Sequence, residues 1–65
     1  MRISVNGEAR EVRGRVLAEL LDELGYGGAV VATAVNGEFV PVTARPALAL
    51  AEGDRVEVLA PMQGG

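Results

Sequence analysis

The chain has 65 residues, of which 49% are hydrophobic and 23% are charged, a composition typical of one small globular domain and not of a disordered chain. Nine acidic residues against six arginines give a formal net charge of −3, so the surface repels phosphate backbones and nucleic-acid binding is not expected. The sequence has no cysteine and no histidine, which excludes disulfides, thiol chemistry, and the commonest general base and metal ligand.

The chain opens with a predicted β-hairpin. Residues 1–5 alternate between apolar and polar side chains, which is the period of a half-buried strand. Asn6-Gly7 follows, a pair that favours the tight turn whose two central residues need positive φ. The chain then returns over residues 8–12. This turn sets Ile3 opposite Arg10, a pairing that fits less well than its neighbours.

A helix is predicted next, because four leucines recur at the spacing of one helical stripe: Leu17, Leu20, Leu21 and Leu24. Gly25 stands where a helix usually ends in a left-handed residue. Asp22 and Glu23 lie near the negative end of the helix dipole, which disfavours their charge. This arrangement fits a weak last turn, and a functional role for the two carboxylates is the alternative.

The second half of the chain begins with a run that is apolar except at Thr33. Residues 30–35 therefore predict an interior strand covered on both faces. Asn36-Gly37 predicts a second hairpin turn, and the return strand over 38–40 ends at Pro41. The tetrapeptide Val-Asn-Gly-Glu thus occurs twice, which we interpret as the same turn chemistry used twice and not as a duplicated domain.

The remaining elements complete the fold prediction. Residues 41–50, with two prolines, predict a loop with at most one helical turn, and residues 55–59 alternate as a strand. One helix can cover one face of a sheet, and the last strand is expected beside the first in parallel. The expected fold is α+β, a ubiquitin-like β-grasp with a mixed four- to five-stranded sheet packed on one α-helix. Residues 1–59 form this domain and residues 60–65 a flexible C-terminal tail.

Catalytic groupings are not found in the sequence. Glu19 and Glu23 lie one helical turn apart, but like charges on a polar helix face are usually only solvated. Ser4 and the threonines have no histidine to activate them. The first residues enter a polar turn at once, unlike a signal peptide, and no apolar run reaches the length of a membrane span. We therefore expect a cytoplasmic protein that is not an enzyme, binds no metal and contacts no membrane.

The chain ends in Gly64-Gly65, the one feature that suggests chemistry. Without a Cβ, glycine lets the backbone enter a narrow tunnel in a partner protein. A terminal carboxylate, with a pKa of about 3.3–3.7, is ionised at neutral pH and is a poor electrophile. Transfer of AMP from ATP would activate it, and a sulfur nucleophile would then leave a thiocarboxylate. The alternative is a frayed tail or a cloning remnant.

Five segments in order resemble the ThiS-type sulfur carriers of thiamine biosynthesis, a β-grasp family that ends in Gly-Gly. They are Val5-Asn6-Gly7-Glu8, the helix from Leu17 to Leu24, Ala34-Val35-Asn36-Gly37-Glu38-Phe39-Val40-Pro41, Glu52-Gly53-Asp54-Arg55-Val56-Glu57-Val58, and Gly64-Gly65. Family members often continue after the Val-Pro pair with arginine and a short helix bearing an aromatic residue. Here Val42 follows Pro41 and Pro46 interrupts the segment, so the short helix is not expected.

The resemblance implies a role for the terminus. A ubiquitin-activating-like adenylyltransferase would adenylate Gly65, a sulfurtransferase or cysteine desulfurase route would deliver sulfur, and thiazole synthase would receive the thiocarboxylate. Gly64 would be the slim residue that enters the partner's active site. No cofactor would be bound permanently, because the activating partner uses the ATP.

Docking to such partners needs an apolar patch near the tail. On the last strand, Leu59 faces the other side of the sheet from Val56 and Val58, and Met62 lies in the tail. Both are therefore candidates for the patch, with Phe39 as a third. Ordinary core packing is the alternative; it is the one we expect for Phe39, and it stays open for Leu59 and Met62.

Three other functions remain open at this point. The small sulfur-carrying subunit of molybdopterin synthase would use the same chemistry with another acceptor, although such chains are usually longer. A ubiquitin-like modifier would form isopeptide bonds with lysines. A β-grasp binding module with a passive tail would keep its activity after loss of Gly64-Gly65.

Overall fold

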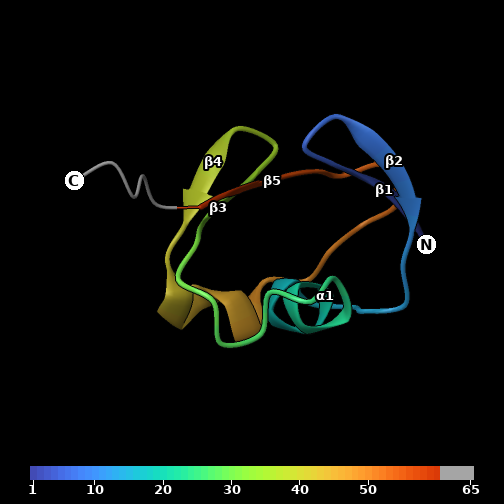
Figure 1. Cartoon of the computed structure of the whole chain (residues 1–65). Coiled ribbons are helices and arrows are strands. Elements are labelled where there is room, and N and C mark those ends of the chain that lie inside the picture. Colours follow the sequence, from blue (N-terminus) through green and yellow to red (C-terminus); the bar gives the residue numbers. More distant parts are fainter. Residues whose placement is uncertain (61–65) are drawn as a thin grey trace.

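A computed structural model describes residues 1–60, which form a five-stranded sheet with one α-helix beneath it (Figure 1). The strand order across the sheet is β2-β1-β5-β3-β4, so the last strand of the chain is the central one. The elements in chain order are β1 (Arg2–Val5), β2 (Glu8–Glu11), α1 (Leu17–Glu23), β3 (Ala32–Val35), β4 (Glu38–Val40), the 3₁₀ helix η1 (Val42–Ala47) and β5 (Arg55–Leu59).

Both predicted hairpins are confirmed, including their turns. Asn6 and Gly7 have φ values of 51° and 85°, and Asn36 and Gly37 have 52° and 83°, as the favoured two-residue turn requires. The first hairpin has the expected register, because Ile3 does lie opposite Arg10. Arg10 is exposed on the edge strand, so the pairing leaves no charge buried.

The predicted closure of the sheet is also confirmed. β5 pairs in parallel with β1, with Val5 opposite Val56, and antiparallel with β3, with Thr33 opposite Val58. The sheet is therefore mixed, and its two hairpins are joined through β5. This is the expected ubiquitin-like β-grasp architecture.

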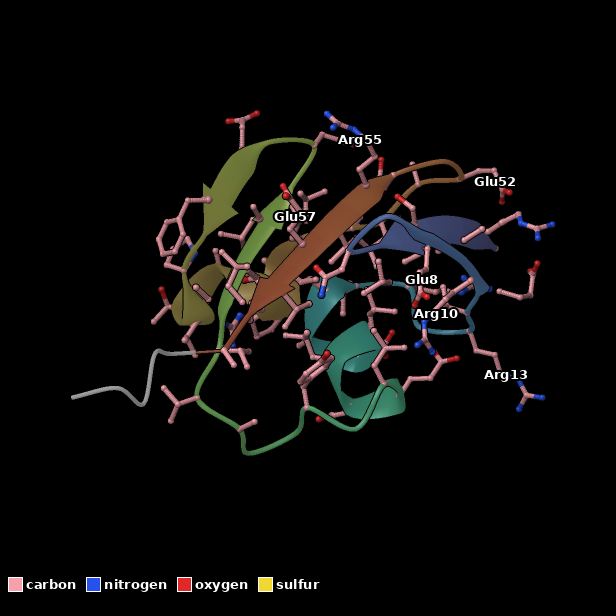
Figure 2. All side chains as sticks on the ribbon, turned by 45° about the horizontal axis from the view of Figure 1, so that its top comes forward. Glu8, Arg10, Arg13, Glu52, Arg55 and Glu57 are labelled. Atoms are coloured by element: carbon pink, nitrogen blue, oxygen red, sulfur yellow. The ribbon has the colours of Figure 1, made fainter. Side chains whose placement is uncertain are left out.

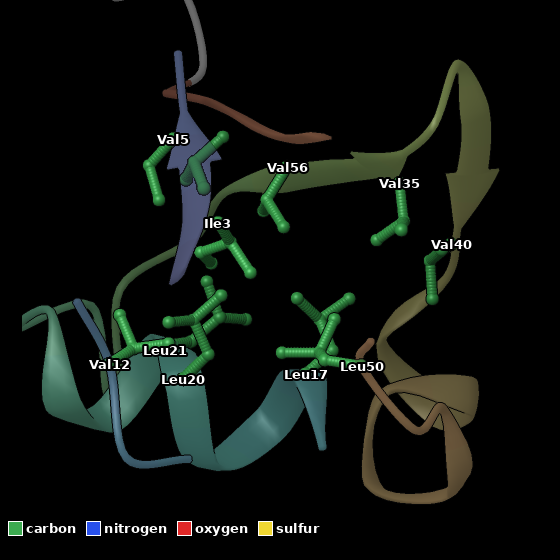
Figure 3. Packing of buried hydrophobic residues seen from close by; sticks show 11 residues of the cluster. Ile3, Val5, Val12, Leu17, Leu20, Leu21, Val35, Val40, Leu50 and Val56 are labelled. Atoms are coloured by element: carbon green, nitrogen blue, oxygen red, sulfur yellow. The ribbon is translucent and has the colours of Figure 1, made fainter. Parts of the chain in front are cut away.

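The core lies between the sheet and α1 (Figure 3). The helix directs its leucine stripe at the sheet, and Leu17 and Leu20 have no exposed surface at all. On the sheet side, Ile3 and Val56 are almost as completely buried. Burying one such side chain contributes about 1.5–3 kcal/mol, so this single stripe supplies much of what holds so small a domain together.

The expectation that residues 30–35 are covered on both faces is wrong. β3 begins at Ala32, and its side chains alternate between the buried Thr33 and Val35 and the more exposed Ala32 and Ala34. The described part of the chain has one α-helix, which covers one face of the sheet only. On its uncovered face β3 carries the small apolar residues Ala32 and Ala34, so the sequence is apolar there although no second layer of structure packs on that face in the described residues.

The expectation of a loop after Pro41 is wrong as well, since residues 42–47 form a 3₁₀ helix with Pro46 inside it. The buried Arg45 attaches this helix to β3. Its Nε donates to Thr33 Oγ1 at 3.0 Å and its Nη2 donates to the Val31 carbonyl at 2.6 Å. Thr33 is the β3 residue opposite Val40, the last residue of β4, so the guanidinium binds at the end of the β3–β4 pairing and to Val31 just before β3.

Two helix glutamates hold the connector between β2 and α1. Glu23 accepts hydrogen bonds from the backbone N–H groups of Arg13 at 3.0 Å and of Gly14 at 2.9 Å, and Glu19 accepts one from Arg15 at 2.8 Å. A Cβ on Gly14 would lie 2.8 Å from the Leu20 backbone nitrogen, so glycine is required for this close approach. Glu23 therefore has a structural role at the end of the helix.

The pKa of Glu23 lies below its ordinary value of 4.5, chiefly because the Gly14 and Arg13 backbone N–H groups stabilise the charged form. A lowered folded-state pKa contributes stability that is complete above 4.5 and is lost as the pH falls through the folded-state pKa. We predict that wild type has a higher Tm than Glu23→Gln at neutral pH and that this gap closes below pH 4.5. Thermal melts of both proteins across pH check this, and a gap that does not change with pH would contradict it.

Candidate functional site

The described acidic side chains lie apart from one another or in structural contacts. Over residues 1–60, no group of three or more acidic side chains lies close enough to hold a metal ion. Glu19 and Glu23, which share one helix face, bind backbone N–H groups of the connector instead. None of the helices within that range is long and apolar enough to cross a membrane. The remaining candidate is the end of β5 and the surface around it.

β5 is held closely up to the point from which the tail departs. Leu59, its last residue, pairs with Ala32 of β3, and the preceding Val58 is only 5% exposed. In Figure 1 this end of β5 points away from the N-terminus, toward the end of β4. Gly64, Gly65 and Met62 lie outside the described residues, so their roles stay predictions, as does the division into domain and tail.

An apolar patch lies beside this exit on the face of the sheet that the helix leaves open. β5 alternates along this face from Arg55 through Glu57 to Leu59, which is 65% exposed. We define the open-face patch as Leu59, Ala32, Ala34 and Phe39, which the strand pairings place as neighbours: Leu59 is opposite Ala32, and Phe39 is opposite Ala34.

Charged side chains gather at the other end of the same sheet. Figure 2 shows Arg55 and Glu52 near the start of β5, and Glu8, Arg10 and Arg13 on the side of the β1–β2 hairpin. Glu57 lies between the two regions, in the middle of β5. The open-face patch is therefore apolar with Glu57 at its edge, opposite Ala34, while more charged side chains lie near the start of β5 and the β1–β2 hairpin.

The expected core packing of Phe39 is wrong, because its side chain is 70% exposed. The reason lies in the short β4 strand, where Val40 faces the core at 7% exposure and the alternation of the strand turns Phe39 to the open face. Leu59 is exposed too, so both described members of the predicted docking patch lie at the surface. An aromatic ring and a leucine exposed together are typical of an interaction site.

Two further apolar side chains at the surface were not expected from the sequence. Val30 is 79% exposed in the loop before β3, and Val42 is 65% exposed at the start of η1. Val30 was included in the predicted strand, and only the two glycines before it, Gly27 and Gly28, signalled a loop. Val42 stands where the ThiS-type sequences often have arginine.

The comparisons with known proteins agree with this geometry. The model of the ThiS family matches residues 3–65. A sulfur carrier protein ThiS of Thermus thermophilus is 43% identical over 61 residues, which are 94% of this chain and 95% of that protein. A thiazole synthase of Paramagnetospirillum magneticum is 36% identical over the whole of this chain, which spans only 20% of that larger protein.

Solved structures show the same fold at high similarity. The crystal structure of the thiamine biosynthesis protein ThiS of Geobacter metallireducens superposes with a TM-score of 0.85, at 36% identity and with both chains covered completely. A solution structure of a thiamine biosynthesis protein from the same organism gives a TM-score of 0.78 at 35% identity, covering all of this chain and 88% of the other. With the family match over nearly its whole length and the same fold, this chain belongs to the ThiS family.

Proposed function

We propose that this protein carries sulfur for thiamine biosynthesis as a thiocarboxylate on Gly65. The carrier role rests on membership of the ThiS family and on the close similarity to a ThiS sulfur carrier. The structural observation that supports delivery of the terminus to partner enzymes is the exposed apolar patch at the end of the central strand. It gives partner enzymes a surface to bind beside the residues that lead to Gly65.

The proposed chemistry takes place in partner active sites. The Gly65 carboxylate attacks the α-phosphorus of ATP, pyrophosphate leaves, and an acyl-adenylate forms. Hydrosulfide then attacks the carbonyl carbon, AMP leaves, and a thiocarboxylate and a proton result. If sulfur arrives as a persulfide on a partner's cysteine, its outer sulfur displaces AMP and forms an acyl disulfide. A second thiol of the partner then attacks the cysteine sulfur of that bond, which forms a disulfide in the partner and releases the thiocarboxylate. The chain has no cysteine or histidine, which fits a co-substrate and not a catalyst.

The proposed partners follow from the steps that the chain cannot perform. An adenylyltransferase resembling ubiquitin-activating enzymes would supply ATP-dependent activation, and a sulfurtransferase or cysteine desulfurase would supply sulfur. Thiazole synthase would accept it, a proposal supported by the relative in which a segment like this chain is part of a thiazole synthase. The use of ATP and the lack of cysteine both fit the cytoplasm as the place of action.

We predict that Gly65 is the modified residue. The wild-type chain is incubated with ATP, a hydrosulfide source and the cognate activating enzyme, and its intact mass is then measured. The expected product has one oxygen replaced by sulfur, and fragmentation places that sulfur on Gly65. Omitting ATP is expected to abolish the change, because the carboxylate alone is a poor electrophile.

Two outcomes would contradict this proposal. Sulfur found on any residue other than Gly65 would remove the terminus from the mechanism. A chain extended by one alanine after Gly65 that still gains sulfur without being trimmed would do the same. Attachment of the chain to lysines of other proteins, without sulfur transfer, would instead favour a ubiquitin-like modifier.

We also predict that the open-face patch contributes to docking. Leu59→Glu places a charge in the patch and is expected to weaken binding to the activating enzyme or to thiazole synthase by at least tenfold, about 1.4 kcal/mol. Because Leu59 lies outside the core, the Tm of the Leu59→Glu variant should be close to that of wild type. The matched control is Ala9→Glu, which adds the same charge to the open face on the edge strand β2, and it should bind like wild type. Titration calorimetry measures the affinities, and equal binding by wild type and Leu59→Glu would remove Leu59 from the patch.

A further inference from the structure

The repeated Val-Asn-Gly-Glu segments do more than form turns. Both asparagines have positive φ, 51° at Asn6 and 52° at Asn36, but glycine adopts this conformation at least as easily. The turn therefore does not need the side-chain amide. Nevertheless, both amides are used, and both bind backbone groups of the same strand, β5.

Asn6 extends the pairing of β1 with β5 beyond the end of β1. The last backbone hydrogen bond is donated by the Asn6 N–H to the Val56 carbonyl at 2.9 Å, after which the chain turns away into β2. The Asn6 side chain then takes over. Its Nδ2 donates to the Val58 carbonyl at 3.1 Å, and the Val58 N–H donates to its Oδ1 at 2.8 Å. A carboxamide has the donor and acceptor of a peptide group, so Asn6 acts as one more strand residue opposite Val58.

Asn36 makes the equivalent contact at the opposite end of β5. Its Oδ1 accepts a hydrogen bond from the Arg55 N–H at 3.0 Å, and its Nδ2 donates to Asp54 Oδ1 at 3.0 Å. Arg55 is the first residue of β5, whereas Val58 immediately precedes its last residue. The two asparagines thus share turn geometry and target strand, and they differ in which end of that strand they hold.

We propose that Asn6 is a positioning residue for the modification of Gly65. Its carboxamide keeps the C-terminal end of β5 paired on both edges at Val58, so Leu59 and Ala60, which lead toward Gly65 in the sequence, have a fixed place beside the sheet. Without it, β3 would hold that end on one edge only, and the positions of Leu59 and Ala60 would be less well fixed. Rates of group transfer are sensitive to such changes, because a displacement of about 1 Å far from the reacting atoms can cost about a hundredfold.

The test compares Asn6→Gly with its matched control Asn36→Gly. Glycine keeps each turn and removes only the carboxamide. The kcat and KM for transfer of AMP to Gly65 are measured with an activating enzyme that modifies wild type, at a temperature at which circular dichroism shows all variants folded. Asn6→Gly is expected to lower kcat/KM by about tenfold or more, mainly in kcat, because Phe39 and Ala34 keep their places in the patch. Asn36→Gly is expected to have the same kcat/KM as wild type, although both variants are expected to have a lower Tm than wild type.

A second pair keeps the proposal testable if Asn6→Gly does not fold. Asn6→Asp keeps the acceptor for the Val58 N–H and loses the donor to the Val58 carbonyl, so its kcat should lie between those of wild type and Asn6→Gly. Asn36→Gly stays the control, because a carboxylate at position 36 would face that of Asp54. Equal losses of kcat at both positions, or none at Asn6, would overturn the positioning role. The inference rests on the proposed function, but a wild-type chain that accepts no AMP would contradict that function itself, independently of the variants.

Discussion

Pairing of β5 on both of its edges is the constraint on which the rest of the structure depends. β1 holds one edge in parallel and β3 holds the other in the antiparallel sense, so the two hairpins have no sheet in common without it. The leucine stripe of α1 packs across the face that this strand completes, with Val56 almost fully buried at its centre. The strand that closes the core is also the last strand of the described residues, and its C-terminal end is paired with β3 on one edge and with the Asn6 side chain on the other.

This arrangement separates stability from function. The buried hydrophobic side chains form one core between the sheet and α1, whereas the apolar patch with Leu59 and Phe39 lies on the open face at the C-terminal end of β5. The described polar side chains that are buried, such as Arg45 and Thr33, bind one another and backbone groups. If the proposed function holds, the domain is a support for a docking surface and a terminus, and the reactive groups belong to its partners.

Features set by local patterns were predictable from the sequence. Asn-Gly pairs, the spacing of four leucines and the alternation of residues 55–59 each specify an element, and their order permits little besides the β-grasp. Features set by contacts between distant residues were not. The alternation of β4 places Val40 in the core and Phe39 on the open face, and the contacts of Arg45 with Thr33 and Val31 hold a 3₁₀ helix that contains Pro46. The repeated tetrapeptide was visible, but the hydrogen bonds of Asn6 with Val58 connect residues 52 positions apart.

Amide hydrogen exchange in the wild-type protein tests most directly whether β5 stays paired up to the tail. The Val58 N–H, whose partner is the Asn6 side chain and not a strand, is the informative proton. Closed pairing predicts that it exchanges as slowly as the Asn6 N–H, which binds the Val56 carbonyl inside the sheet. Exchange at the rate of the exposed amide of Ala60 would mean that the end of β5 opens freely, and it would contradict a terminus presented from a fixed strand.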